Sequence, residues 1–273
     1  MLRPIDRSLR HLSDAIRTQT FENTLMPNPF TLEPMLVLMR DYHRLPFTAE
    51  RFEAYLKLAV GDAKRAADVP KPPLAYMNPM GKEHVLEALN QWIAFDAEAL
   101  VLATLEDASQ RLELDLPPLK VGLVIVDDLR GGWTNRFFND ASFRFKLEGI
   151  RKTGWIPIPL WSSEAPSLES LRLEVLECCA RVAHFWERGE PTTLGEMMRQ
   201  EGYVAAFAGR QITLSRDDLE YTRIILEPLL DSQHQPTQMA ALYGDAVATE
   251  LGYPPRGLSP RAGFGLALWE ALP

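Results

Sequence analysis

The residues with the greatest capacity for chemistry lie between Asp127 and Arg136, directly after the apolar run Val121–Val126. Two adjacent carboxylates, Asp127 and Asp128, open the segment. Ligands of open α/β sheets bind beyond the carboxyl ends of the strands, so a site is expected here. The rest of the segment holds side chains and glycines that suit ligand binding: Arg130, Gly131, Gly132, Trp133, Asn135 and Arg136.

The two aspartates are the candidate catalytic residues. Adjacent carboxylates at the end of a strand suit a hard divalent cation, either Mg²⁺ or Mn²⁺, and they can alternatively hold a proton. Metal-assisted hydrolysis and phosphate-group chemistry are the reactions that such parts suit, which makes a hydrolase one interpretation.

The remaining residues of the segment are candidates for substrate binding. Each arginine can hold a carboxylate or a phosphate with two parallel hydrogen bonds, which predicts an anionic substrate. The glycine pair lets the backbone approach a ligand closely. Trp133 would stack on a ring of the substrate, and Asn135 would orient it.

The same residues also fit an ordinary polar connector. Aspartate and glycine favour turns, arginines pair with nearby aspartates, and a tryptophan fills a core. No glycine spacing matches the dinucleotide-binding or P-loop patterns. The alternative function is therefore a non-catalytic helical interaction or scaffold protein, and whether the chain is an enzyme stays open at this stage.

A second pair of candidates lies on a long helix expected from Lys82 to about Arg111. Residues 92–103 are apolar on nearly every face, which is typical of a buried helix. Asp96 and Glu98 interrupt this apolar stretch, and a buried carboxylate must be paired, bound to a cation or neutralised. Each is interpreted either as half of a structural ion pair or as a general base with a raised pKa.

Histidine and cysteine patterns give weaker signals. No histidine matches a zinc-protease or di-iron spacing. Glu83 and His84 with Glu87 form the only dense acid–histidine cluster, at a helix start where acids favour the helix dipole. The neighbouring Cys178 and Cys179 read as two small buried hydrophobic residues.

Composition limits the partners. The chain has 273 residues, 46% of them hydrophobic, and a net charge of −8. A negative chain repels phosphate backbones, which makes a nucleic-acid partner unexpected. No apolar run is long enough to span a membrane, and the first ten residues lack the apolar core of a signal peptide, so a cytoplasmic location is expected. The partner is then a small molecule or a protein, with a homo-oligomer as one option.

Hydrophobic periodicity predicts a mainly helical α+β fold. We expect a single compact domain over 1–273, with its weakest joint in the proline-rich stretch 69–80 and its helices around a small central sheet. The sheet is expected from a β-α-β unit within 120–161. Its strands are 121–126, buried on both faces, and 155–161, placed at an edge by Pro157 and Pro159.

Helix boundaries follow from caps and helix-ending residues. Within the β-α-β unit, a helix is expected over 139–153, with Asn139 or Asp140 as its cap and Gly154 at its end. Towards the N-terminus, Thr31 is expected to cap a helix that begins at Leu32.

Overall fold

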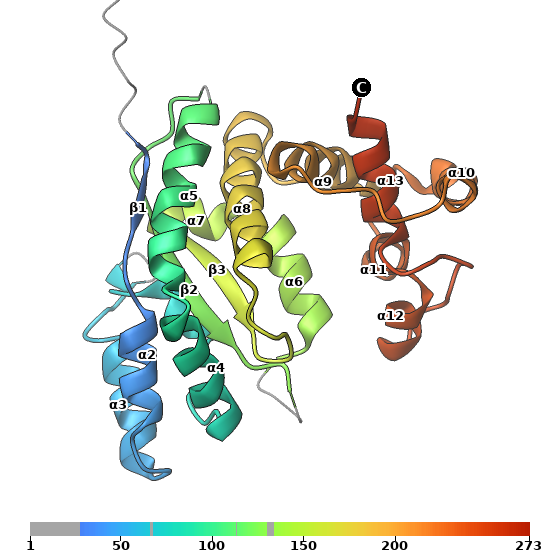
Figure 1. Ribbon diagram of the computed structural model, residues 1–273. Helices are drawn as coiled ribbons and strands as arrows, with labels where there is room; N and C mark the ends of the chain where they lie inside the picture. The colour runs from blue at the N-terminus through green and yellow to red at the C-terminus, as the bar shows by residue number, and fades with distance from the viewer. Residues whose placement is uncertain (1–27, 66–67, 113, 130–133) are drawn as a thin grey trace, which may run out of the picture.

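The protein is described here by a computed structural model, which covers residues 28–65, 68–112, 114–129 and 134–273 (Figure 1). It is mainly helical around a small parallel sheet, which confirms the expected α+β class. The three strands run in the order β1-β2-β3, and Val121 of the central strand pairs with Leu32 on one side and Ile156 on the other. The strands are β1 (Phe30–Leu32), β2 (Leu119–Val126) and β3 (Trp155–Trp161).

The central strand is the most buried element. Every residue of β2 except Lys120 is buried, as the continuous apolar run predicts for a strand covered on both faces. Gly122 has a packing role, because a Cβ atom built there would lie 2.6 Å from the sulfur of Met35. At the edge of the sheet, β3 carries Pro157 and Pro159, whose missing N–H groups are tolerated there.

The connection from β2 to β3 corrects the expected helix over 139–153. It contains two helices, α6 (Arg136–Phe145) and α7 (Glu148–Thr153). The cap is Asn135, whose side chain accepts hydrogen bonds from the N–H groups of Phe137 and Phe138, so the helix begins before either expected cap. It breaks at Lys146, which leaves helical geometry, whereas Gly154 ends α7 in the left-handed region as predicted.

The segment before β2 corrects two further expectations. Thr31 caps no helix, because it pairs with Lys120 in the sheet. The helix expected over 82–111 is divided at Asp96, which has a φ of 52°. The elements of this segment that follow β1 are α2 (Leu36–His43), α3 (Ala49–Ala59), the 3₁₀ helix η3 (Pro72–Tyr76), α4 (Glu83–Ala94) and α5 (Ala97–Arg111).

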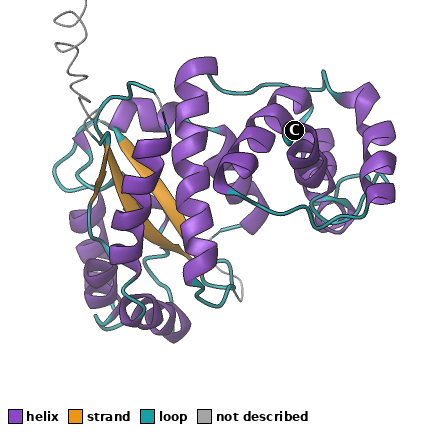
Figure 2. Ribbon diagram, turned by 45° about the horizontal axis from the view of Figure 1, so that its top comes forward, coloured by secondary structure: helices purple, strands orange, loops and turns teal. Residues whose placement is uncertain are grey.

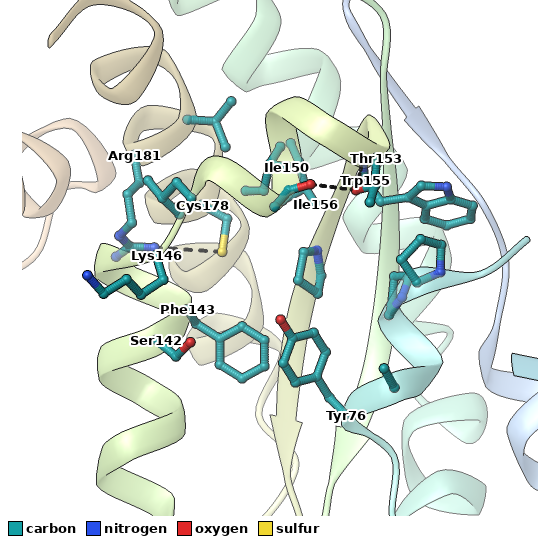
Figure 3. Close-up of a pocket in the computed structure, with 17 residues that line it drawn as sticks. Tyr76, Ser142, Phe143, Lys146, Ile150, Thr153, Trp155, Ile156, Cys178 and Arg181 are labelled. Atoms are coloured by element: carbon teal, nitrogen blue, oxygen red, sulfur yellow. Dashed lines mark hydrogen bonds between the residues drawn. The ribbon is translucent and has the colours of Figure 1, made fainter. Parts of the chain in front are cut away.

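The C-terminal part is entirely helical. Helix α8 runs beside α5 along one face of the sheet, and η3 lies against the other face (Figures 1 and 3). The remaining helices form a group beside the sheet (Figure 2) with an apolar cluster of their own. The elements are α8 (Leu168–Arg188), α9 (Leu194–Ala208), α10 (Arg216–Leu226), the 3₁₀ helix η4 (Glu227–Leu229), α11 (Gln235–Tyr243), α12 (Asp245–Glu250) and α13 (Ala262–Ala271).

None of the helices in the described ranges has both the length and the apolarity needed to cross a bilayer. Cys178 and Cys179 are buried on α8, as expected, and both are free thiols. Burial raises the pKa of each thiol, which keeps both in the unreactive protonated form.

Candidate functional site

The candidate site is centred on Asp127, which directly follows β2 and is only 2% exposed. Its carboxylate accepts hydrogen bonds from Asn78 Nδ2 at 2.7 Å, His84 Nε2 at 2.8 Å and Ser162 Oγ at 2.9 Å. Burial alone would raise the pKa of this carboxyl group, but the three donors outweigh burial and lower it. Asp127 is therefore a fixed anion at the end of the central strand.

The three donors come from segments far apart in sequence. Asn78 lies in the loop between η3 and α4, and His84 lies in the first turn of α4. Ser162 directly follows β3, whose carboxyl end meets that of β2 because the two strands are parallel. The sheet therefore brings Asp127 and Ser162 together, and α4 brings the imidazole to them.

The contact with Asp127 defines the chemistry of His84. Since an ionised carboxylate only accepts hydrogen bonds, the Nε2 atom of His84 must carry the donated proton. The neutral imidazole then has its lone pair on Nδ1, and its side chain is 23% exposed. A histidine oriented in this way by a buried carboxylate is suited to general acid–base catalysis.

Asp128 is also a buried, fully engaged carboxylate, with its side chain 3% exposed. It accepts hydrogen bonds from the backbone N–H of Ser163 at 2.9 Å and from the Ser163 hydroxyl at 2.7 Å. Arg136 Nη1 contacts it at 3.1 Å, and the same guanidinium group pairs with Glu164 and lies 4.0 Å over the ring of Trp161. Arg136 is thus already paired within the protein.

The carboxylate oxygens of both aspartates accept hydrogen bonds from groups of the protein itself. This occupancy bears on the hypothesis of a bound divalent cation. Asp127 and Asp128 accept hydrogen bonds on all four carboxylate oxygens, and Ser162 Oγ bridges them. In the described part of the chain, no group of three or more potential metal-ligating side chains is assembled. A Mg²⁺ or Mn²⁺ at these residues stays a prediction from the sequence.

The substrate-binding candidates have different outcomes. Arg130, Gly131, Gly132 and Trp133 lie outside the described residues. Asn135 is described, and its side-chain oxygen is occupied as the cap of α6. The structure therefore brings together Asp127, Asp128 and Arg136 from the predicted set.

The second pair of candidates does not form a buried base. Asp96 is exposed at the turn between α4 and α5, so the expectation of apolar burial is wrong for it. The helix division places it there, since the residue takes a left-handed conformation. Glu98 is partly buried, and its Oε1 atom accepts hydrogen bonds from the backbone N–H groups of Met35 at 2.7 Å and Leu36 at 3.0 Å. Glu98 therefore provides a hydrogen-bond acceptor for backbone N–H groups at the start of α2.

A buried arginine supports the loop that carries Asn78 and leads to His84. Arg51 is 1% exposed and donates to Nδ1 of His43 at 2.7 Å and to the carbonyl of Gly81 at 3.0 Å. Burial and the neighbouring guanidinium lower the pKa of His43 to about 4, so this imidazole is neutral at pH 7. These hydrogen bonds of Arg51 thereby hold the loop before α4 in place.

Sequence reasoning missed Asn78, His84 and Ser162 as site residues. Two signals could have found them. Ser162 follows the second predicted strand, at the edge of the sheet where Asp127 must also lie. His84 belongs to the one dense acid–histidine cluster, which the helix dipole explained without a catalytic role. Asn78 lies in a loop, where spacing carries no signal about its partner.

A small cavity lies beside the first residues of β3 (Figure 3), and Asp127 is not among the residues that line it. It has a volume of about 140 Å³ and is lined mainly by apolar surface, including Tyr76, Phe143 and Ile156. Arg181 and Cys178 border it, but the guanidinium of Arg181 is held by Glu201 at 2.8 Å. The cavity therefore has few polar groups available to a ligand.

Comparison of the chain with protein-family models, with curated proteins and with solved structures gives no match.

Proposed function

We propose that the protein is an enzyme that acts on a small molecule with a negatively charged group, with His84 as its general base. The observation that carries the proposal is the hydrogen bond between His84 Nε2 and the buried Asp127. It joins an accessible imidazole to a fixed carboxylate at the carboxyl end of a parallel sheet, where ligands bind in such folds.

Each residue has a distinct role in this proposal. His84 takes a proton from the substrate, or from a water molecule that attacks it, through Nδ1. Asp127 is a positioning residue, because it sets the tautomer of the imidazole and stabilises the positive charge that forms on proton uptake. Asn78 and Ser162 hold the carboxylate in place from two sides.

Two features near His84 favour a negatively charged substrate. The imidazole lies in the first turn of α4, where the helix dipole favours anions. Lys82 directly precedes the helix and is exposed, with no carboxylate within ion-pair distance among the described residues. Hydrolysis is the reaction class that needs the fewest further parts, since water supplies the nucleophile.

A screen followed by kinetics tests the proposal. A panel of phosphate- and carboxylate-bearing small molecules is added to the protein, and the imidazole NMR signals of His84 identify those that bind. Hits are then assayed for conversion by the wild type, by His84→Gln and by the control His234→Gln, which lies at the start of α11.

We expect conversion by the wild type and the control, and a rate at least about 100-fold lower for His84→Gln, the usual contribution of a general base. The proposal fails if no panel member shifts the His84 signals, or if a compound is converted equally well by His84→Gln.

A second candidate function, protein interaction, is favoured by an apolar surface on α3. Phe52 and Leu56 lie one helical turn apart and are 42% and 44% exposed, and Val60 and Phe47 nearby are 41% and 52% exposed. We propose a second copy of the chain as the partner. Light scattering would then show a dimer that Phe52→Ser with Leu56→Ser converts to a monomer, and a monomeric wild type would contradict this role.

A further inference from the structure

A large cleft lies between the sheet-bearing part of the chain and the C-terminal helices. Its volume is about 530 Å³, within the range of small-molecule sites. Helices α6 and α8 form one side, and α9, residues 210–213 and the start of α13 form the other. Arg136 and Trp161 also line it, which places the cleft next to the Asp128 side of the strand-end site.

Most charged groups at the base of the cleft neutralise one another. Glu201 lies at the centre of this network, where burial would raise its pKa but two arginines lower it to about 2. These groups are held in place, and their charges are compensated within the network and so are not available to pair with a ligand. The network consists of Glu201 with Arg181 at 2.8 Å and with Arg144 at 2.5 Å, Arg144 with Asp140 at 2.9 Å, and Arg210 with Glu177 at 2.5 Å.

Arg261 is a cationic residue of the cleft lining that takes no part in the ion pairs of this network. Its guanidinium group lies 4.5 Å over the ring of Phe264, and no carboxylate of the described residues is within ion-pair distance. Its backbone has a φ of 57°, a left-handed conformation that costs free energy in a residue other than glycine. Such conformations are found disproportionately at ligand sites. Asp140 attracts this guanidinium group from beyond ion-pair distance, and a cation of a cleft with no direct carboxylate partner favours an anionic ligand group.

Glu174 is an acidic residue of the cleft lining that likewise takes no part in the ion pairs of the network. It is half-buried on α8, and within the described part of the chain its carboxylate forms no ion pair. Its one polar contact is the weak donor Cys178 Sγ at 3.7 Å. Burial and the neighbouring Glu177 raise its pKa by more than the nearby Arg144 and Arg181 lower it.

Trp92 adds an unused donor to the same cleft. The side chain is part of the lining and only 5% of the residue is exposed. Its Nε1 atom is buried and has no hydrogen-bond partner among the described residues. Buried donors are almost always paired, so this N–H group is an unusual feature beside the cleft lining.

We propose that the cleft binds a small amphoteric molecule, one that carries both an acidic group and a protonated amine, such as a free amino acid or a close derivative. The acidic group pairs with Arg261, and the amine pairs with Glu174.

The charges of Arg261 and Glu174 have opposite sign, and this difference indicates the class of ligand. A purely anionic ligand would leave Glu174 without a partner, and a purely cationic ligand would leave Arg261 without one. The rings of Trp161 and Phe264 in the lining offer apolar contact to the rest of the ligand. The inference goes beyond the proposed function, because it does not require proton transfer at His84.

Binding measurements on the whole protein test this proposal. Saturation-transfer NMR with a panel of free amino acids and O-phosphoethanolamine identifies binders, and calorimetry gives their dissociation constants. Each binder is then compared with its analogue that lacks the amine and with its analogue that lacks the acid. The carboxylate and phosphate members of the panel distinguish the two kinds of acidic group.

The variants are Arg261→Gln and Glu174→Gln, with Arg223→Gln as the control. Arg223 is also stacked on an aromatic ring, that of Trp269, but it is not part of the cleft lining. Circular dichroism checks that each variant is folded. His84→Gln is included because it tests the proposed function and should leave binding in the cleft unchanged.

We expect at least one amphoteric compound to bind the wild type and the Arg223→Gln control equally. Arg261→Gln, Glu174→Gln and each one-charge analogue should weaken binding by about tenfold or more, the size of one lost charge-assisted hydrogen bond. The proposal is overturned if no panel member binds, if an analogue without the amine binds as tightly as its parent, or if both cleft variants bind normally.

Discussion

The Nε2 atom of His84 lies 2.8 Å from the Oδ1 atom of Asp127, a contact that spans 43 residues of sequence. It joins the first turn of α4 to the end of the central strand. Because Asp127 is buried and held by two further donors, the imidazole is directed by a group that has little freedom to move. The pair gives the strand-end site its clearest chemical capacity.

Removing the Asp127 carboxylate should cost stability as well as function. In Asp127→Ala, the buried donors of Asn78 and Ser162 lose their acceptor, and we expect the free energy of unfolding to fall by about 1–3 kcal/mol. Urea denaturation at pH 7 measures the loss. Glu53→Ala, an exposed position on α3, is the control and should change stability little. Equal stability of Asp127→Ala and the wild type would contradict the hydrogen-bonding described.

The buried His43 predicts a specific pH dependence. Its pKa is lowered from 6.5 to about 4 in the folded protein, so the unfolded chain binds a proton between these values that the folded chain does not. Stability should therefore decrease as pH falls from 6.5 to about 4, by up to about 3 kcal/mol from this residue.

The variant His43→Gln isolates this effect. Glutamine keeps an acceptor for Arg51 but does not titrate. Urea denaturation from pH 7 to pH 4 should show a shallower loss for His43→Gln than for the wild type, and parallel curves would show that His43 is not buried in a neutral form.

The charge network under the cleft should be sensitive to loss of its central carboxylate. In Glu201→Gln, the buried guanidinium groups of Arg144 and Arg181 lose their shared anion, and we expect a loss of about 3–5 kcal/mol. The matched control is Glu220→Gln, which breaks an exposed pair with Arg216 and should cost less than about 1 kcal/mol. Similar losses in the two variants would rule out a buried network.

Two glycines give a matched test of helix packing. A Cβ atom on Gly202 of α9 would overlap the carbonyl of Ala267 on α13, so Gly202→Ala should destabilise the protein by about 1–3 kcal/mol. Gly149 of α7 has open space around it, and Gly149→Ala should be neutral or stabilise by up to about 1 kcal/mol. Thermal unfolding distinguishes the two, and a stabilised Gly202→Ala would contradict the close α9–α13 contact.

The features that the sequence predicted correctly are those set by local patterns. The apolar run before Asp127 defined a buried strand, two prolines placed β3 at an edge, and Gly154 ended a helix. The predicted boundaries of helices and strands were wrong where they depend on tertiary contacts. Thr31 has the side chain of a helix cap, but pairing with Lys120 places it in a strand. Asp96 follows an apolar stretch, but the helix breaks there and exposes it.

The candidate site was predicted only in part, for a related reason. Asp127 could be found because it adjoins a strand end, which is visible in the sequence. Its partners Asn78 and His84 precede it by 49 and 43 residues, and no spacing rule links them to it. A contact of this kind is fixed by how helices pack on the sheet, which single-sequence patterns do not encode.

The most direct test of the central claim is the tautomer of His84, read from a long-range ¹H–¹⁵N NMR spectrum of histidine-labelled protein at alkaline pH. The signals are assigned with His84→Gln. A carboxylate at Nε2 predicts that the neutral imidazole carries its proton on Nε2 and that Nδ1 is unprotonated, with a mixture of tautomers in Asp127→Ala. A proton on Nδ1 in the wild type would contradict the arrangement and remove His84 as the proposed base.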